Sequence, residues 1–296
     1  MGVVKRLAYV AAESTDLSAW KSYATEILGF ELGSDSNDKL LYLRADENHH
    51  RIAVRAGNRD DVGYIGWQVA NREALEAAAA TLDAAGVSVA RATPEEIADR
   101  RVLDMLYFTC PHSGVRMELV VSPEINYTPR FRPTRDLAGF RTGEQGLGHV
   151  VLYAENLHAA ADFYVRLLGF GISDFAMIPS VGPLAVFMHC NQRHHSLAFM
   201  RIPGAPRRIQ HIMFETLSMD DVGRSFDLCS DREIITTTPG RHHNDHTYSF
   251  YFKTPSLWHM EFGWQPRTID PVNWTTEHYE LRGDHAWGHH GLMEMV

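Results

Sequence analysis

Residues 6–32, RLAYVAAESTDLSAWKSYATEILGFEL, recur 140 positions later as residues 146–172, GLGHVVLYAENLHAAADFYVRLLGFGI. Seven residue pairs are identical at this constant offset, and both copies share the sequence Leu-Gly-Phe near their ends. Each copy begins with an apolar run that predicts a strand and continues with an apolar stripe of helical period. The stripes consist of Leu17, Trp20, Ala24, Ile27 and Leu28, and of Leu157, Ala160, Tyr164, Leu167 and Leu168. Gly29 and Gly169 stand where a left-handed glycine ends a helix. The repeat predicts a duplicated unit.

Two weaker copies follow the same strand-then-helix pattern, at residues 64–87 and 209–229. Gly86 suits the end of one helix, and Ser218 suits the N-cap of the other. Strand-like stretches lie between the helices at 40–45, 105–110, 117–121, 185–190, 196–201, 248–253 and 259–264. The sequence therefore predicts an α+β fold of four βαβββ modules, in two similar halves that each curl a sheet into a barrel around a cavity.

We expect two domains, because residues 122–146 are rich in Pro, Arg and Gly and lack periodicity. Residues 1–135 would form a module pair without a metal site. Residues 136–296 would form the catalytic pair, with a tail over 265–296 wrapped on the core.

Composition excludes several classes of protein. The 296 residues include 28 Lys and Arg against 37 Asp and Glu, for a net charge of −9. This balance argues against a nucleic-acid partner, and no apolar run is long enough to span a membrane. The first residues lack a signal-peptide pattern. We expect a cytoplasmic protein, because an odd number of widely spaced cysteines is typical of a reducing compartment: Cys110, Cys190 and Cys229.

Histidine is concentrated in the second half, where 14 of the 17 histidines lie from residue 149 onward. His149 and His211 fall in the first strands of the third and fourth modules, and Glu261 falls in the last strand of the fourth. If the modules pack as repeats, these side chains converge. Two histidines and one carboxylate form the facial set that leaves open positions on non-haem Fe(II).

The first half provides an internal comparison. Tyr9 stands at the position of His149, Gly66 lies near the position of His211, and Glu118 is the counterpart of the carboxylate. The N-terminal half therefore cannot build the same site. Spacing alone leaves an alternative open, because a histidine in an apolar strand is more often a hydrogen-bonded core residue.

A longer stretch, GRHHNDHTYSFYFKTPS over 240–256 and onward to Glu261, resembles the signature of the type I extradiol catechol dioxygenases of the vicinal oxygen chelate superfamily. Residues 143–152 and 190–199 and the tail triplet Trp287-Gly288-His289 resemble the same family. Members that act on 2,3-dihydroxybiphenyl are the nearest likeness. Leu257 departs from the signature, which expects Gly or Pro there, and so puts the local turn in doubt.

The resemblance implies Fe(II), or Mn(II), bound by His149, His211 and Glu261, with O2 as co-substrate. It implies an enzyme that cleaves an aryl-substituted catechol beside its hydroxyl pair in the degradation of aromatic compounds. The implied acid–base residue is His195, and the residues that hydrogen-bond the substrate or reacting oxygens are His242 and Tyr251. The remaining residues orient this network or line the substrate pocket: Asn244, Asp245, Phe187, Val151 and Ala198. The resemblance also implies a homo-oligomer.

Three other histidines have simpler interpretations. His194 would point to the other face of its strand and play a structural role. His243 and His246 would be surface or structural residues.

Three alternatives remain. The substrate could be a steroid-derived, polycyclic or alkyl catechol, since the pocket would depend on loops such as residues 173–184. A metal-free protein of this fold that sequesters small molecules would lack the metal-binding set. A glyoxalase-type isomerase would need a fourth protein ligand, which is not evident at a repeat-related position.

Overall fold

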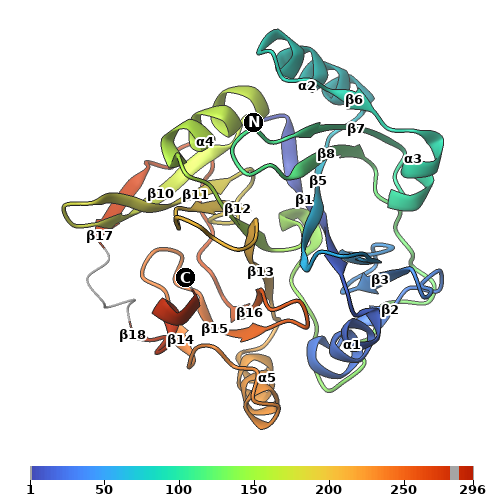
Figure 1. The fold of residues 1–296 in the computed structure, drawn as a ribbon, viewed down its shortest axis with the longest axis vertical. Helices are drawn as coiled ribbons and strands as arrows, with labels where there is room; N and C mark the ends of the chain where they lie inside the picture. Colours follow the sequence, from blue (N-terminus) through green and yellow to red (C-terminus); the bar gives the residue numbers. More distant parts are fainter. Residues whose placement is uncertain (1, 281–286, 296) are drawn as a thin grey trace.

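The two halves of the chain form two mixed sheets with a common strand order, seen in the computed structural model of residues 2–280 and 287–295. The N-terminal sheet has the order β2-β3-β4-β1-β5-β8-β7-β6. The C-terminal sheet repeats it as β10-β11-β12-β9-β13-β16-β15-β14, with β17 and β18 added at its edges. In Figure 1 the N-terminal half, blue to teal, lies on the right, and the C-terminal half, yellow to red, lies to the left and below. This arrangement confirms the α+β fold with duplicated halves.

The first half contains β1 (Val4–Ser14), α1 (Leu17–Ser22), η1 (Tyr23–Leu28), β2 (Glu31–Leu32), β3 (Leu40–Arg44), β4 (Ile52–Ala56), β5 (Asp61–Val69), α2 (Arg72–Ala84), β6 (Ala90–Arg91), α3 (Pro94–Arg100), β7 (Asp104–Thr109) and β8 (Arg116–Val121). The second half contains η2 (Gly143–Gln145), β9 (His149–Tyr153), α4 (Leu157–Phe163), η3 (Tyr164–Leu168), β10 (Gly171–Ile178), β11 (Gly182–His189), β12 (Leu197–Met200), β13 (Ile209–Glu215), α5 (Met219–Asp231), β14 (Gly240–Arg241), β15 (Tyr248–Lys253) and β16 (His259–Trp264). The tail contains β17 (Glu277–Glu280), β18 (Trp287–Gly288) and η4 (Leu292–Met295).

The repeated helices begin and end for the same local reasons. The side chains of Asp16 and Asn156 cap α1 and α4 by accepting a backbone N–H three residues further on. Both helices continue as π-helical turns, η1 and η3, and each ends at a glycine with φ 73°, Gly29 and Gly169. Ser218 caps α5 as predicted. These local signals were readable from the sequence.

Two segments differ from expectation. Residues 173–184, predicted as a loop, belong to the β10–β11 hairpin. Buried Ser173 and Asp174 interrupt the apolar pattern there and hide the strand from the sequence. Helix α3 was also missed, although Thr93 and Glu96 form a capping box. Part of the predicted tail, residues 281–286 and 296, lies outside the described residues.

The two halves pack against each other through equivalent surfaces. Phe30 contacts Phe214 with ring centroids 4.8 Å apart, and Phe170 contacts Trp67 at 5.2 Å. Phe30 and Phe170 are repeat equivalents, and Trp67 and Phe214 occupy matching positions in β5 and β13. All four side chains belong to one hydrophobic cluster that includes residues of both sheets. The boundary at residues 135 and 136 stays a prediction, and the two halves share a core across it.

Candidate metal centre

Three side chains from neighbouring strands converge inside the C-terminal half. The Nε2 atoms of His149 and His211 lie 2.9 Å apart, and Glu261 Oε2 lies 3.1 Å from the first and 3.3 Å from the second. Strand register places them together, because Met213 of β13 pairs with both His149 and Glu261. All three side chains are buried. Among the described residues, they form the cluster able to hold a metal ion.

The geometry of this cluster fits a divalent cation. Neighbouring ligands on an octahedral ion with bonds of about 2.1 Å lie roughly 3 Å apart, close to the observed separations. Among the residues that the structure describes, none makes a well-aligned hydrogen bond to either carboxylate oxygen of Glu261. Burial would raise the pKa of Glu261, but His149, His211 and His242 outweigh it and hold that pKa well below the usual range. The Gln210 side-chain oxygen contacts Nδ1 of His211 and so keeps Nε2 available as a ligand.

His195 lies beside the candidate ligands. Its ring is 4.0 Å from the ring of His149, and Phe187 approaches it edge-on at 4.9 Å. Burial, with His149 and His194 as further causes, holds the pKa of His195 well below its ordinary value. A neutral imidazole at this place can accept a proton.

His242 and Tyr251 also border the cluster, and the ring of Tyr251 lies 5.1 Å from the ring of His211. His242 Nε2 lies 2.8 Å from the Tyr251 hydroxyl and 3.5 Å from Glu261 Oε1. Tyr251 on β15 pairs in register with Glu261 on β16. The ring of His289 stacks on His242 at 4.3 Å, a contact that the sequence analysis did not assign. The sequence feature that points to His289 is the triplet Trp287-Gly288-His289 in the tail.

Asn244 and Asp245 lie in the turn between β14 and β15, and both are buried. Asp245 Oδ2 lies 4.0 Å from Nδ1 of His195, and its carboxylate accepts hydrogen bonds from the backbone and hydroxyl of Thr247. Burial raises the pKa of Asp174, and the neighbouring His194 and Asn244 act in the opposite direction. His243 and His246 are exposed.

The three residues predicted to line the pocket form one row across the sheet. Ala198 of β12 pairs with Phe187 of β11 and with Val151 of β9, and Val151 pairs with His211. Directly paired residues point to the same face of a sheet. The row therefore runs toward the candidate ligands, and its role in substrate binding stays a prediction.

Leu257 adopts a left-handed backbone conformation with φ 64° and exposes its side chain. This conformation favours glycine, which accounts for the glycine in the resembled signature. The turn that precedes β16 is formed despite the departure at this position.

Comparisons with known proteins assign the chain to a family. The family profile described as "Glyoxalase/Bleomycin resistance protein/Dioxygenase superfamily" matches residues 146–262, and the one described as "Dihydroxybiphenyl dioxygenase BphC D1" matches residues 7–57. A biphenyl-2,3-diol 1,2-dioxygenase of Paraburkholderia xenovorans (strain LB400) is 37% identical and aligns over 98% of this chain and 97% of its own. The chain belongs to the extradiol dioxygenases.

Two further relatives and a solved structure support this assignment to the extradiol dioxygenases. A 1,2-dihydroxynaphthalene dioxygenase of Sphingobium xenophagum is 39% identical over 90% of each chain. An iron-dependent extradiol dioxygenase of Rhodococcus jostii (strain RHA1) is 37% identical over 97% of each chain. The crystal structure of a catechol 2,3-dioxygenase, 36% identical, superposes with a TM-score of 0.90 and covers 98% of this chain and 96% of that chain. No helix among the described residues is long and apolar enough to cross a membrane.

The N-terminal half of this extradiol dioxygenase keeps the positions of the candidate ligands but changes the residues. Gly66 pairs with Tyr9 in the register that joins β5 to β1, and the residue two positions before it is Tyr64. The equivalent step in β13 leads from the partner of His149 to His211. Tyr64 is therefore the counterpart of His211, which corrects the sequence-based alignment with Gly66.

Two guanidinium groups and a tyrosine hydroxyl surround the counterpart of the ligand carboxylate in this half. Glu118, fully buried, is the counterpart of the ligand carboxylate. The Tyr9 hydroxyl donates to its Oε2 at 2.8 Å, and Arg100 donates to its Oε1 at 2.9 Å. Arg100 also covers the ring of Tyr64 at 3.8 Å, and Arg116 donates to Glu118 at 2.8 Å. Tyr9, Arg100 and Arg116 therefore provide hydrogen bonds and positive charge to the buried carboxylate.

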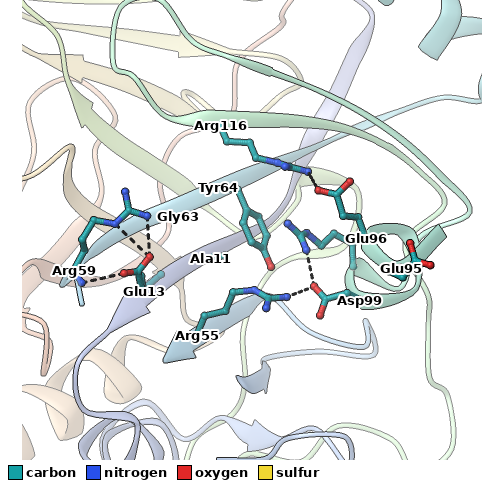
Figure 2. A pocket seen from close by; sticks show the side chains of 12 residues that line it. Ala11, Glu13, Arg55, Arg59, Gly63, Tyr64, Glu95, Glu96, Asp99 and Arg116 are labelled. Carbon is teal, nitrogen blue, oxygen red and sulfur yellow. Dashed lines mark hydrogen bonds and ion pairs between the residues drawn. The ribbon is translucent and has the colours of Figure 1, made fainter. Parts of the chain in front are cut away.

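A cavity of about 490 Å³ opens beside Arg100 and Arg116 in the N-terminal half. Figure 2 shows that its arginines face carboxylates rather than open space. The ion pairs around it are Arg55–Asp99, Arg59–Glu13, Arg100–Asp99 and Arg116–Glu96. Because each cation already has an anionic partner, we place the candidate catalytic site in the C-terminal half.

Proposed function

We propose that this chain is an Fe(II)-dependent extradiol dioxygenase that cleaves an aryl-substituted catechol such as 2,3-dihydroxybiphenyl in the degradation of aromatic compounds. Both atoms of O2 would enter the product, and the ring would open beside the hydroxyl pair. The observation that carries the proposal is the convergence of His149, His211 and Glu261 beside the buried imidazole of His195. The names of the most similar relatives support the substrate class.

Fe(II) is the metal that we propose for the three ligands. Two imidazoles and one carboxylate suit Fe(II) and also accept Mn(II), so the donor set by itself does not choose between them. A relative named for iron dependence supports Fe(II). When bound, Fe(II) supplies the Lewis acidity and the electron transfer to O2 that ring cleavage requires.

His195 is the residue that we assign to proton transfer. A catechol must lose a proton to bind as an anion, and a neutral imidazole has one unprotonated ring nitrogen that can accept it. The same nitrogen would later return that proton to a reacting oxygen. The ring distance of 4.0 Å to His149 keeps His195 within reach of a substrate held at the metal.

His242 and Tyr251 would hold the oxygens of the substrate or of O2. Their side chains are joined at 2.8 Å, His242 lies 3.5 Å from Glu261 Oε1, and the ring of Tyr251 lies 5.1 Å from the ring of His211. Burial and the nearby carboxylates raise the pKa of Tyr251 well above its ordinary value, so its hydroxyl keeps its proton and can donate a hydrogen bond. Phe187, Val151 and Ala198 would provide an apolar wall for the ring substituent.

The test is oxygen uptake by protein loaded anaerobically with Fe(II) and given 2,3-dihydroxybiphenyl. We expect one O2 consumed per catechol and a yellow ring-opened product. The metal-free protein and the Glu261→Gln variant are the controls. No uptake by protein with confirmed Fe(II) would reject cleavage of biaryl catechols.

A polycyclic catechol is the second candidate substrate. The relative from Sphingobium xenophagum, named for 1,2-dihydroxynaphthalene, is 39% identical to this chain, the same identity as a biphenyl-2,3-diol 1,2-dioxygenase of Sphingomonas paucimobilis. The ratio of kcat/KM values for 1,2-dihydroxynaphthalene and 2,3-dihydroxybiphenyl decides between the two. A steroid-derived or alkyl catechol would be preferred only if both aromatic substrates are poor.

Two further properties belong to this proposal. A cytoplasmic location is supported by the free state of the three cysteines Cys110, Cys190 and Cys229. A homo-oligomer is expected from the family, and light scattering of the purified protein tests it.

A further inference from the structure

A buried carboxylate and two histidines form a chain that leads to the proposed acid–base residue. Asp174 on β10 is fully buried, and its Oδ2 lies 3.2 Å from Nε2 of His194. Nδ1 of His194 lies 3.2 Å from Nδ1 of His195. His194 is also fully buried, and it lies in the loop between β11 and β12 rather than in a strand as the sequence predicted.

The carboxylate decides which nitrogens of this chain carry protons. The contact between Nε2 of His194 and Oδ2 of Asp174 is an ion-pair contact rather than an aligned hydrogen bond. An ionised carboxylate at 3.2 Å favours a proton on the nitrogen that faces it, so we assign the proton of His194 to Nε2. Nδ1 of a neutral His194 is then an acceptor. Nδ1 of His195 must donate to it, because two acceptors at 3.2 Å would leave both lone pairs unsatisfied. This leaves Nε2 of His195 without a proton.

Two other charged groups, Asp245 and Arg267, face this chain and favour opposite proton positions. Asp245 Oδ2 lies 4.0 Å from Nδ1 of His195 and favours a proton on the same nitrogen. Arg267 Nη2 lies 3.5 Å from Nε2 of His194 and would favour the opposite arrangement. That guanidinium is farther away than Asp174 and donates to Glu277 at 2.9 Å. The nearer carboxylate therefore determines the proton on His194.

The other half of the molecule contains a related arrangement without the buried carboxylate. His49 and His50 have Nδ1 atoms 3.1 Å apart, and Nε2 of His49 lies 3.4 Å from Oδ2 of Asp35. The side chain of Asp35 is 42% exposed and is shared with Arg101. The contact between adjacent histidines thus belongs to the repeated loop. The half with the candidate metal centre has instead the fully buried carboxylate of Asp174, 3.2 Å from His194.

We propose that Asp174 and His194 are positioning residues that keep the proton of His195 on Nδ1 and leave its Nε2 free to take the proton of a catechol hydroxyl. In that step the O–H bond of the catechol breaks and an N–H bond forms at Nε2, so the catechol becomes an anion and His195 becomes an imidazolium. This inference rests on the proposed function for its substrate, but the tautomer it predicts does not depend on activity.

The first experiment reads the tautomer directly. Long-range 1H–15N correlation spectra of the metal-free protein with 15N-labelled histidine distinguish Nδ1–H from Nε2–H rings, and the His195→Gln variant assigns the signals. We expect His195 as the Nδ1–H form in the unmodified protein. We expect a shift toward Nε2–H in Asp174→Leu, which keeps the volume but removes the acceptor. The Arg267→Leu variant is the control and should leave the Nδ1–H form unchanged.

The second experiment measures kcat and KM of the Fe(II)-loaded variants with 2,3-dihydroxybiphenyl. Asp174→Leu and His194→Phe should lower kcat about 10- to 100-fold, the usual effect of removing an orienting partner, with KM and bound iron nearly unchanged. Arg267→Leu should keep its kcat.

Four outcomes are informative. A His195 that is Nε2–H in the unmodified protein, or unchanged in Asp174→Leu, would overturn the inference. A loss of kcat and a tautomer change in Arg267→Leu alone would also overturn it. That result would mean that Arg267, rather than Asp174, determines the proton position on His194. An Nδ1–H His195 that shifts in Asp174→Leu, with kcat lowered as expected, would support it. The same spectra in a protein with no dioxygenase activity would support the tautomer and reject the proposed function.

Discussion

Two buried glutamates at matching positions show how single residues separate the halves. Glu118 and Glu261 occupy equivalent places in β8 and β16, and both side chains are almost fully buried. A buried carboxylate needs compensation, because its desolvation is costly. Tyr9 and Arg100 provide it for Glu118 through direct hydrogen bonds. Around Glu261 the close contacts are to the imidazoles of His149, His211 and His242, and a metal ion held by the three ligands would provide the positive charge.

At the residue scale we predict that His211→Ala abolishes stoichiometric metal binding. Only two of the three ligand atoms would remain, and the buried carboxylate would lose one of its neighbours. Metal analysis after anaerobic loading and gel filtration measures the effect. His195→Ala is the matched control. It should retain the metal but lose about 10²- to 10⁴-fold in kcat. A fully loaded His211→Ala variant, or a fully active His195→Ala variant, would contradict the assigned roles.

A second prediction at this scale concerns pH and His50. Burial, with His49 as the next cause, lowers the pKa of His50 to about 3. In the unfolded chain the pKa of histidine is about 6.5, so the unfolded state binds the extra proton between these values. The free energy of unfolding should therefore fall as the pH falls below about 6.5, by about 1.4 kcal/mol per pH unit from this residue. Urea unfolding of the metal-free protein at several pH values measures this slope. His50→Gln, which cannot titrate, should have a shallower slope, and equal slopes would reject the argument.

At the scale of elements, strand β5 depends on a glycine that faces its neighbour. A Cβ atom built at Gly66 would lie 2.4 Å from the ring of Tyr9. That ring cannot move freely, because its hydroxyl is bonded to Glu118 in the interior. The tyrosine that fills the N-terminal position and the glycine opposite it thus form a matched pair across β1 and β5.

We predict that Gly66→Ala destabilises the protein by about 1–3 kcal/mol, the usual cost of overpacking. Gly63→Ala on the same strand is the control, because its Cβ would meet nothing closer than 3.6 Å. The control should change stability by less than about 0.5 kcal/mol. Urea unfolding of both variants compares them, and equal losses would show that strand position rather than the Tyr9 contact is responsible.

At the scale of the whole molecule, the halves are coupled by the aromatic contacts that each repeats. Phe30 of the first half packs on Phe214 of the second, and Trp67 of the first packs on Phe170 of the second. Since neither half encloses its apolar surface alone, we expect the chain to unfold as one unit despite the duplicated sheets.

We predict that Phe30→Ala lowers the free energy of unfolding by about 3–5 kcal/mol, the typical cost of truncating a buried phenylalanine. Hydrogen exchange read by mass spectrometry reports each half separately. Slow-exchanging peptides of both halves should lose protection by the same factor. Loss confined to the N-terminal half would show that the halves are independent domains, as the predicted boundary at residues 135 and 136 suggests.

Local patterns carried much of the information in this sequence. The repeat at constant offset predicted the duplicated fold, since strand and helix periods and capping residues act over a few positions. The positions of His149, His211 and Glu261 in apolar strands predicted a metal site, because equivalent strand positions in paired modules must face one cavity. The same signals predicted β15 and β16 with the bounds that the structure has.

Features that depend on strand pairing could not be read in this way. The alignment of β5 with β13 rests on register, so the sequence placed Gly66 where Tyr64 belongs. Asp174 lies in a strand whose buried polar residues break the expected alternation, and its contact with His194 joins two segments 20 positions apart. Hydrophobic period identifies which face of an element is buried. It does not specify which partner meets that face, and that choice is made by the packing of the whole chain.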